Sequence, residues 1–334
     1  MEIKTLQLSY QDSMLLRGWA ILMMLFLHCF NYHPQDTYFD FVIFGNTLSW
    51  WLTKIAGLCV PLYCFLSGYG LYKKYPYGYD YCFRKTYFLV KRYWFFLLLF
   101  YLLGVVFFNS YSIELNEILS NFLGYDTTYN PTLWFLLPYL IIMIVSPILI
   151  KWFKFYKMWK SLIVVSVAYI LAFFCLKMNS EGIWMIPVGI RVLLSAIHLA
   201  FSFMLGAIVA ELGIPRLRLF KNDIVRNNFV LFVFLLLLIC FRALIDNSIL
   251  APPICLILIV IITNIRYSEK WRIILYTMGK HSLNMWFIHA YFTYSYLGFI
   301  IYWSKFPLLI FLLLVLVSYI ISALSELFFK RFNI

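Results

Sequence analysis

Long apolar segments recur along the whole chain, and they constrain its fold more than any other feature of the sequence. A helix needs about 20 mainly apolar residues to cross the hydrocarbon core of a bilayer. Segments of this kind lie near 14–32, 46–72, 86–108, 132–150, 161–178, 188–211, 228–245, 250–265, 282–300 and 307–329. Pro61, in the middle of the second segment, predicts a kink or a break there. We therefore expect an all-α, polytopic integral membrane helix bundle of about ten transmembrane helices.

The composition indicates that lipid is the solvent for most of the molecule. Hydrophobic residues make up 64% of the chain and charged residues only 12%, whereas an ordinary soluble domain has roughly 25% charged residues. The mean hydropathy is +0.87. The loops between the apolar segments are too short to fold alone. The sequence therefore predicts one transmembrane domain over residues 1–334 and no separate soluble domain.

The distribution of positive charge predicts the orientation of the chain. Most of the 27 Lys and Arg residues fall in segments that ten spans place on one face of the membrane, and these include Lys4, Lys157, Arg216, Arg218 and Lys221. The opposite face receives Lys177, Arg191, Arg242 and Lys305. Because positive residues concentrate on the cytoplasmic side, we expect both termini in the cytoplasm. The protein is then a multi-pass protein of the cell (cytoplasmic or inner) membrane.

Several chemistries lack their sequence signatures. The seven cysteines lie mostly in apolar segments without a CxxC or Cys/His ligand spacing, so we expect buried apolar side chains and no metal site. No P-loop, GxGxxG, HExxH or GxSxG pattern is present in the sequence. The net charge of +13 reflects membrane orientation, and we expect no nucleic acid partner. The first apolar segment lacks a small-residue cleavage site, which favours a retained span over a signal peptide.

Two ionisable residues, Arg17 and His28, lie in the first span. Their spacing of eleven residues in a helix leaves them about 20° apart around the axis and about 16 Å apart along it. They therefore share one stripe, and an ionisable residue within a span normally faces the bundle interior or a water-filled cavity. An imidazole there can take a proton from a hydroxyl near neutral pH. The alternatives are a packing role for His28 and an Arg17 side chain that snorkels to lipid headgroups.

The span from Arg17 to His28 resembles the first helix of the acyltransferase 3 family of transmembrane acyltransferases. Three further stretches resemble motifs of that family in order and spacing. These are 60–69 with its Ser-Gly-aromatic end, 133–147 with its Leu-Trp-Phe start, and 278–289 with its late Gly-x-x-Ser…His pattern. The family also has about ten spans, so the resemblance extends over essentially the whole chain.

The resemblance implies acyl transfer, usually of acetyl from acetyl-CoA, onto carbohydrate of the cell envelope. It implies that His28 is the catalytic histidine and that Arg17 is the functionally important arginine of the first helix. Ser67, Gly68 and Tyr69 match the Ser-Gly-aromatic motif, for which close helix packing by small residues is the structural alternative.

Two aromatic residues belong to the other matching stretches. Trp134 is expected to be an interfacial anchor or a packing residue rather than a substrate contact. His289 is expected to be structural, because nothing beside it in the sequence makes it a better base than His28.

A basic cluster at the start of the third span departs from the family pattern. The family commonly has Arg-x-x-Arg there, whereas this chain has Leu89 at the first of these positions. The basic residues around it are Arg84, Lys85, Lys91 and Arg92. We expect them to bind the phosphates of acyl-CoA, together with Arg17. The departure weakens the inference of a bidentate role for one particular arginine, and ordinary positive-inside charge is the alternative.

These observations predict a membrane-embedded O-acyltransferase, most simply an O-acetyltransferase, which transfers groups other than aminoacyl groups. Its partners would be acetyl-CoA (or another acyl-CoA) as donor substrate, a hydroxyl of a cell-surface polysaccharide or lipid-linked glycan as acceptor, and the lipid bilayer. No bound cofactor is expected. The rival hypothesis is a glycan or lipid transporter or flippase, which ten spans and a Pro-broken helix also allow. A catalytically inactive family member that serves in a complex is a third reading.

Overall fold

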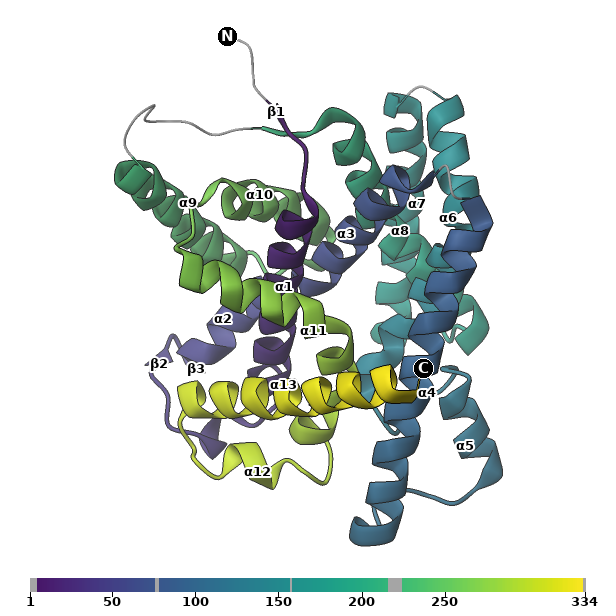
Figure 1. Ribbon diagram of the computed structural model, residues 1–334, viewed down its shortest axis with the longest axis vertical. Helices are drawn as coiled ribbons and strands as arrows, with labels where there is room; N and C mark the ends of the chain where they lie inside the picture. Colours follow the sequence, from purple (N-terminus) through teal and green to yellow (C-terminus); the bar gives the residue numbers. More distant parts are fainter. Residues whose placement is uncertain (1–4, 76–77, 157, 216–223, 333–334) are drawn as a thin grey trace. The chain divides into compact units, whose positions relative to one another are not determined.

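The computed structural model describes residues 5–75, 78–156, 158–215 and 224–332, and within these ranges the chain is almost entirely helical (Figure 1). The all-α prediction is therefore confirmed. The basic residues Lys4, Lys157, Arg216, Arg218 and Lys221, which the charge analysis counts, lie outside the described ranges. The strands are two residues long: β1 (Thr5–Leu6) pairs antiparallel with β4 (Ile214–Pro215), and β2 (Val42–Ile43) with β3 (Asn46–Thr47).

The helices follow one another without long irregular connections. In chain order they are α1 (Tyr10–Phe30), η1 (Gln35–Thr37), α2 (Leu48–Ala56), α3 (Cys59–Lys73), α4 (Gly78–Phe108), α5 (Leu115–Phe122), η3 (Pro131–Phe135), α6 (Leu136–Phe155), α7 (Met158–Ser180), α8 (Val188–Leu212), α9 (Ile224–Leu244), η4 (Ser248–Leu250), α10 (Ala251–Asn264), α11 (Glu269–Thr293), α12 (Phe299–Tyr302) and α13 (Pro307–Phe332).

Eight helical segments in the described part of the chain are long and apolar enough to cross a membrane. The sequence predicts about ten, and the difference lies in α10 and α11. The α10 helix has only 14 residues. The α11 helix has 25 residues, but polar side chains such as Lys280, His281 and Asn284 lie along it. It begins earlier and ends earlier than the expected span at 282–300, because the first half of α11 is too polar for hydropathy to indicate a span there.

The second expected span is broken, as Pro61 predicts. The chain leaves the α-helix at Gly57 and Leu58, so that α2 and α3 are separate helices. Pro61 lies in the first turn of α3, where its missing N–H costs little because the first N–H groups of a helix have no intrahelical partner. The break therefore falls just before the proline rather than at it.

The contacts divide the chain into two compact units. Within the described ranges, unit 1 consists of residues up to 66, residues 211–293 and residues from 297 onward. Unit 2 consists of residues 67–210 and 294–296. Unit 1 contains α1, α2, α9, α10, α11, α12 and α13, whereas unit 2 contains α4 to α7 and most of α8. The α3 helix contributes its first half to unit 1 and its second half to unit 2.

The α1 helix is the centre of unit 1 and contacts α2, α10, α11 and α13. Its start is fixed by a capping box: the Asp12 backbone N–H donates to Ser9 Oγ over 3.1 Å, and the Ser9 N–H donates to the Asp12 carboxylate over 2.9 Å. Met14, Ile21 and Leu25 are buried along one side at successive spacings of seven and four residues. His28 continues that stripe into the last turn of the helix.

Glycines allow α1 and α11 to approach backbone to backbone (Figure 1). A Cβ placed on Gly18 would lie 2.1 Å from the carbonyl oxygen of Leu275, and one placed on Gly279 would lie 1.9 Å from the carbonyl oxygen of Met14. No side chain larger than hydrogen fits at either position without a shift of the backbone. These two glycines therefore set the distance between the two helices.

Unit 2 has a cluster of four tyrosines, Tyr101, Tyr111, Tyr129 and Tyr296, which we call the tyrosine cluster. The Tyr101 and Tyr129 rings are stacked with their centres 5.1 Å apart, and the centre of the Tyr111 ring lies 4.8 Å from that of Tyr129. The edge of Tyr296 faces Tyr111 at 5.8 Å. Offset and edge-to-face contacts of this kind stabilise a fold beyond simple burial. They attach the loop after α4 to the segment before η3.

Candidate functional site

Two histidines from distant parts of the sequence meet in unit 1. His28 lies in the last turn of α1 and is partly exposed, whereas His289 lies near the end of α11 and is completely buried. Their ring centres are 5.0 Å apart and their planes are tilted by 39°. Both histidines were proposed from the sequence, and the structure brings their rings into direct contact.

Backbone hydrogen bonds fix the orientation of His289. Its Nδ1 lies 2.7 Å from the carbonyl oxygen of Trp286 and 3.3 Å from that of Met285. A carbonyl only accepts hydrogen bonds, so Nδ1 must carry a proton. The neutral ring then has its lone pair on Nε2, and this atom is buried with no hydrogen-bond partner among the described residues.

Arg17 also lies on α1, next to the packing glycine Gly18, and its side chain is partly exposed. The helix is continuous from Arg17 to His28, so the two side chains lie about 20° apart around its axis, as their spacing predicts. They remain separated by about 16 Å along it. Arg17 is thus too far from His28 to orient the imidazole directly.

A third histidine and a tyrosine, which the sequence analysis did not single out, support the end of α1. His33 Nε2 lies 2.7 Å from the carbonyl oxygen of Thr293, and the His33 ring lies 4.0 Å from that of Tyr302. The Tyr302 hydroxyl donates to the carbonyl oxygen of Cys29 over 3.1 Å. These contacts join the ends of α1 and α11 to α12. Sequence spacing gives no signal for them, because they join residues about 260 positions apart.

Polar residues that lie near His28 in the sequence point elsewhere. Asn46 accepts a hydrogen bond from Gln35 Nε2 over 3.0 Å, and Tyr32 is 72% exposed. The described residues also hold no group of three or more His, Cys, Asp or Glu side chains that could bind a metal ion. The His28–His289 pair is therefore the chemically distinctive feature of this region.

The Ser-Gly-aromatic motif lies in unit 2 and forms a helix crossing. A Cβ on Gly68 would lie 1.8 Å from the carbonyl oxygen of Phe203, so α3 and α8 touch backbone to backbone at this glycine. Ser67 Oγ lies 2.7 Å from the Tyr139 hydroxyl, and Tyr69 is 4% exposed. This geometry is the close packing by small residues that the sequence leaves open as the structural alternative.

The basic cluster lies on α4, in unit 2, and its members differ in exposure. Arg84 and Lys85 are exposed, Lys91 is partly exposed, and Arg92 is 8% exposed. The Arg92 guanidinium lies 4.4 Å from the centre of the Phe88 ring, in cation–π geometry. Arg84 and Lys91 are two helical turns apart, as are Lys85 and Arg92, so all four lie on neighbouring stripes of the helix. Arg84 and Lys85 are the members open to a soluble anion.

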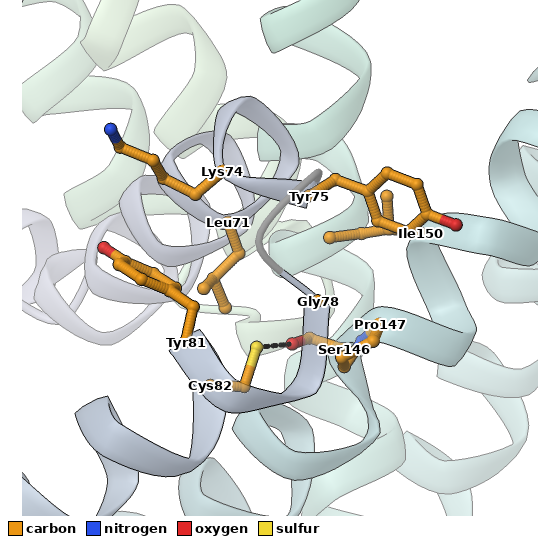
Figure 2. Close-up of a pocket in the computed structure, with 9 residues that line it drawn as sticks. All are labelled: Leu71, Lys74, Tyr75, Gly78, Tyr81, Cys82, Ser146, Pro147 and Ile150. Carbon is orange, nitrogen blue, oxygen red and sulfur yellow. Dashed lines mark hydrogen bonds between the residues drawn. The ribbon is translucent and has the colours of Figure 1, made fainter.

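Trp134 and a small pocket complete the features of unit 2 near the predicted motifs. Trp134, in η3, is 50% exposed, with its ring 6.1 Å from that of Phe135. The pocket lies between the end of α3, the start of α4 and α6, and Figure 2 shows the Cys82 thiol facing the Ser146 hydroxyl at 3.4 Å inside it. Its lining comes mainly from Leu71, Lys74, Tyr75, Tyr81 and Ile150.

The site residues proposed from the sequence thus fall in both units. Arg17, His28 and His289 belong to unit 1, and the motif and basic-cluster residues belong to unit 2: Ser67, Gly68, Tyr69, Arg84, Lys85, Lys91, Arg92 and Trp134. The structure places the His28 ring in contact with the His289 ring. The contacts described for the motif and basic-cluster residues are with other parts of unit 2.

These observations define a polytopic helical membrane protein in which a histidine of the first helix contacts a histidine of a late helix. The model of the acyltransferase 3 family, described as an acyltransferase domain, matches residues 12–327, and the chain belongs to this family. The match includes α1, α11 and every motif on which the resemblance was based. No curated protein and no solved structure shows a significant match to the chain.

Proposed function

We propose that this protein is a membrane-embedded O-acyltransferase that transfers an acetyl group from acetyl-CoA to a hydroxyl of a cell-surface polysaccharide or lipid-linked glycan. Family membership supports acyl transfer. The observation that carries the proposal further is the position of His28. It is a partly exposed imidazole that follows ten apolar residues (18–27) of α1 and contacts a second, buried imidazole. Ionisable groups in such positions are usually functional.

The chemistry assigned to His28 is general-base catalysis. The acceptor hydroxyl gives its proton to His28 while its oxygen attacks the thioester carbonyl. The C–S bond then breaks, the new ester C–O bond remains, and the protonated His28 returns the proton to the leaving CoA thiolate. The products are the acylated acceptor and free CoA, and His28 ends in its starting state. Burial of the reaction within the bundle would exclude water and so limit thioester hydrolysis.

The donor site that we propose rests on charge. CoA carries several phosphate charges, which lysine and arginine bind well. Arg17 on α1 and the basic cluster on α4 are the candidates, and within that cluster Arg84 and Lys85 are the exposed side chains. By the positive-inside rule these residues lie in the cytoplasmic halves of their helices, on the side of the membrane where acyl-CoA is present. We accordingly propose that both termini are cytoplasmic, that the protein lies in the cell membrane, and that residues 1–334 act as one domain.

The test is turnover by purified protein in bilayers with labelled acetyl-CoA and candidate glycan acceptors. Release of free CoA and labelling of the acceptor are measured together, because a transporter or flippase would produce neither. The His28→Ala variant is expected to lose roughly 10²- to 10⁴-fold in turnover, the usual contribution of a general base. Its melting temperature and circular dichroism should stay close to those of the unchanged protein.

A matched control is His198→Phe in α8. His198 stacks on Tyr169 with ring centres 4.6 Å apart, so phenylalanine preserves the aromatic contact. This variant should retain turnover. If His28→Ala also retains turnover, His28 is not the base. If the unchanged protein never releases CoA with any acceptor, the proposed acyl transfer from acetyl-CoA is wrong.

A further inference from the structure

Several buried polar atoms of the described residues have no hydrogen-bond partner, and one of them in unit 1, His289 Nε2, belongs to a ring that packs against a second imidazole. His289 is 0% exposed, and its Nδ1 is committed to the Trp286 carbonyl at 2.7 Å. Its Nε2 has no hydrogen-bond partner among the described residues. Buried polar atoms are nearly always hydrogen-bonded, so an exception calls for a physical explanation.

The tautomer determines what this atom can do. With the proton on Nδ1, a neutral His289 has an Nε2 that can only accept a hydrogen bond. Among its neighbours on α11, Met285, Ile288 and Phe292 are apolar and buried, and the Thr293 hydroxyl donates to the His289 carbonyl oxygen over 3.3 Å. No residue of α11 donates to Nε2 in the structure, so we look for a donor on another helix.

The His28 ring is the group that lies opposite. Its centre is 5.0 Å from that of His289, and the 39° tilt prevents flat stacking. In the structure the two rings do not share a hydrogen bond through His289 Nε2, and a rotation of the His28 side chain is needed to bring one of its N–H groups within hydrogen-bond distance of that atom. The two helices are held at this distance by Gly18 and Gly279, so the approach is built into the backbone.

We propose that His289 is a positioning residue: once the His28 side chain has rotated, His289 Nε2 accepts a hydrogen bond from a ring N–H of His28 and thereby leaves the other His28 nitrogen unprotonated toward the acceptor hydroxyl. The inference rests on the proposed acyltransferase function. It gives His289 a role in the reaction, in place of the purely structural role that the sequence predicts. The neutral imidazole of His289 would orient the catalytic histidine, as a carboxylate does in many hydrolases.

The arrangement also has an electrostatic consequence. When His28 takes the acceptor proton it becomes a cation with two N–H donors, and the bond to His289 Nε2 then becomes charge-assisted and stronger. The partner therefore stabilises the protonated base more than the resting one. Interactions that strengthen as the reaction proceeds raise kcat rather than substrate affinity.

The decisive variants are His289→Phe and His289→Gln. Phenylalanine preserves ring size and burial but has no acceptor atom, and it also removes a buried unpaired polar atom, so folding should be retained. We expect kcat to fall roughly 10- to 100-fold with little change in the KM for acetyl-CoA, as for other outer partners that orient a reactive imidazole. Glutamine offers an amide oxygen as acceptor and should recover part of the lost kcat.

The matched control is His281→Phe, on the same helix. His281 Nδ1 lies 2.8 Å from Ser322 Oγ, so this histidine is already paired with α13. Its replacement should leave kcat within about twofold of the unchanged protein, in contrast with the loss expected when an orienting partner is removed. If His289→Phe keeps full kcat while His28→Ala is inactive, the positioning role is wrong and the proposed function stands. If His28→Ala is active, the proposed function itself fails.

A measurement on the unchanged protein completes the test without any change to folding. Solid-state ¹⁵N NMR of histidine-labelled protein distinguishes protonated from unprotonated ring nitrogens, and the chain has only five histidines to assign. His289 should carry its proton on Nδ1, and the Nε2 signal should shift when His28 is replaced by Ala. A proton on His289 Nε2, or an unchanged signal in that variant, would overturn the proposal.

Discussion

The histidine pair of unit 1 and the tyrosine cluster of unit 2 are both groups of polar aromatic side chains, but they differ in how their polar atoms are used. Every hydroxyl of the tyrosine cluster has a partner. Tyr101 and Tyr129 both donate to the carbonyl oxygen of Ser112, at 3.2 and 3.1 Å, and Tyr296 donates to that of Phe100 at 2.6 Å. Tyr111 lies 2.8 Å from Ser295 Oγ. In the histidine pair, by contrast, the buried acceptor His289 Nε2 has no hydrogen-bond partner in the part of the chain that the structure describes.

This difference in hydrogen bonding is what we expect between a cluster that stabilises the fold and a pair that takes part in the proposed reaction. A fully bonded cluster gains its free energy in the resting fold, since each buried bond contributes about 1 kcal/mol. A buried acceptor without a bond costs free energy, and such costs persist where the site needs the atom for another step. A group of polar aromatic residues therefore does not by itself mark a site in this protein, and the role proposed for His289 rests on an unpaired atom in a ring that also packs against a second imidazole.

Gly279→Val is expected to have the largest effect on stability and turnover, and it tests whether the histidine pair depends on the contact between α1 and α11. The new side chain would collide with the Met14 carbonyl, 1.9 Å from its Cβ, so α1 and α11 must separate. We expect a loss of about 3 kcal/mol in the free energy of unfolding. Acyl transfer should fall at least as far as in His289→Phe, because the pair is pulled apart. Thermal unfolding and turnover are measured side by side.

Gly189→Val serves as the control for that experiment. Gly189 lies in the first turn of α8, and a Cβ there meets nothing within 4 Å. This variant should change neither stability nor turnover beyond the helix propensity of valine, a few tenths of a kcal/mol. Normal turnover in Gly279→Val would show that the activity does not depend on the contact between the two helices.

A smaller effect, confined to stability, is expected for Tyr111→Phe. The substitution removes the contact with Ser295 Oγ at 2.8 Å and the bond to the Tyr129 carbonyl at 3.2 Å, at a cost of about 1 to 2 kcal/mol. Turnover per folded molecule should not change. Chemical denaturation in detergent gives the stability, and the acetyl-CoA assay gives the turnover. If turnover falls as far as is expected for His289→Phe, the tyrosine cluster also takes part in the activity and its contrast with the histidine pair is wrong.

The smallest effect concerns alkaline pH. Burial, with nearby Glu117 and the other tyrosines and Asp126, raises the pKa of Tyr129 to about 12 from its usual 10. Burial also raises the pKa of Tyr111 and of Tyr296. The folded state thus holds these protons more tightly than the unfolded chain. Their contribution to stability is complete below pH 10 and decreases as the pH rises from 10 toward 12.

The melting temperature should therefore fall over that pH interval, and less steeply in Tyr129→Phe than in the unchanged protein. The His289→Phe variant should show the unchanged slope, because imidazoles are already neutral there. An identical slope in Tyr129→Phe would mean that ionisation of this tyrosine does not limit stability at high pH.

Much of the fold follows from local signals in the sequence. Hydropathy gives the long helices, Pro61 gives the break between α2 and α3, and the eleven-residue spacing gives the common stripe of Arg17 and His28. Hydropathy fails for α11, because polar side chains along that helix are tolerated when they face protein rather than lipid. A signal for its packing was present in Gly279, but its partner could not be identified.

The pairing of His28 with His289 is tertiary information. It depends on contact between helices more than 250 residues apart, and no local pattern specifies that contact. The sequence predicts only that Arg17 and His28 share a stripe that faces the bundle interior or a water-filled cavity. It does not say which helix lies opposite. The hydrogen bonds that leave His289 Nε2 unused are visible only in the structure.

Gly18 fixes where along α1 the helix contacts α11, because its backbone lies against the carbonyl group of Leu275. His28 follows ten residues later in the same helix, so its position relative to this contact depends on the number of residues between them. One residue added or removed between the two would swing that imidazole by about 100° and slide it by about 1.5 Å. The number of residues between Gly18 and His28 is therefore constrained independently of which apolar side chains occupy the interval.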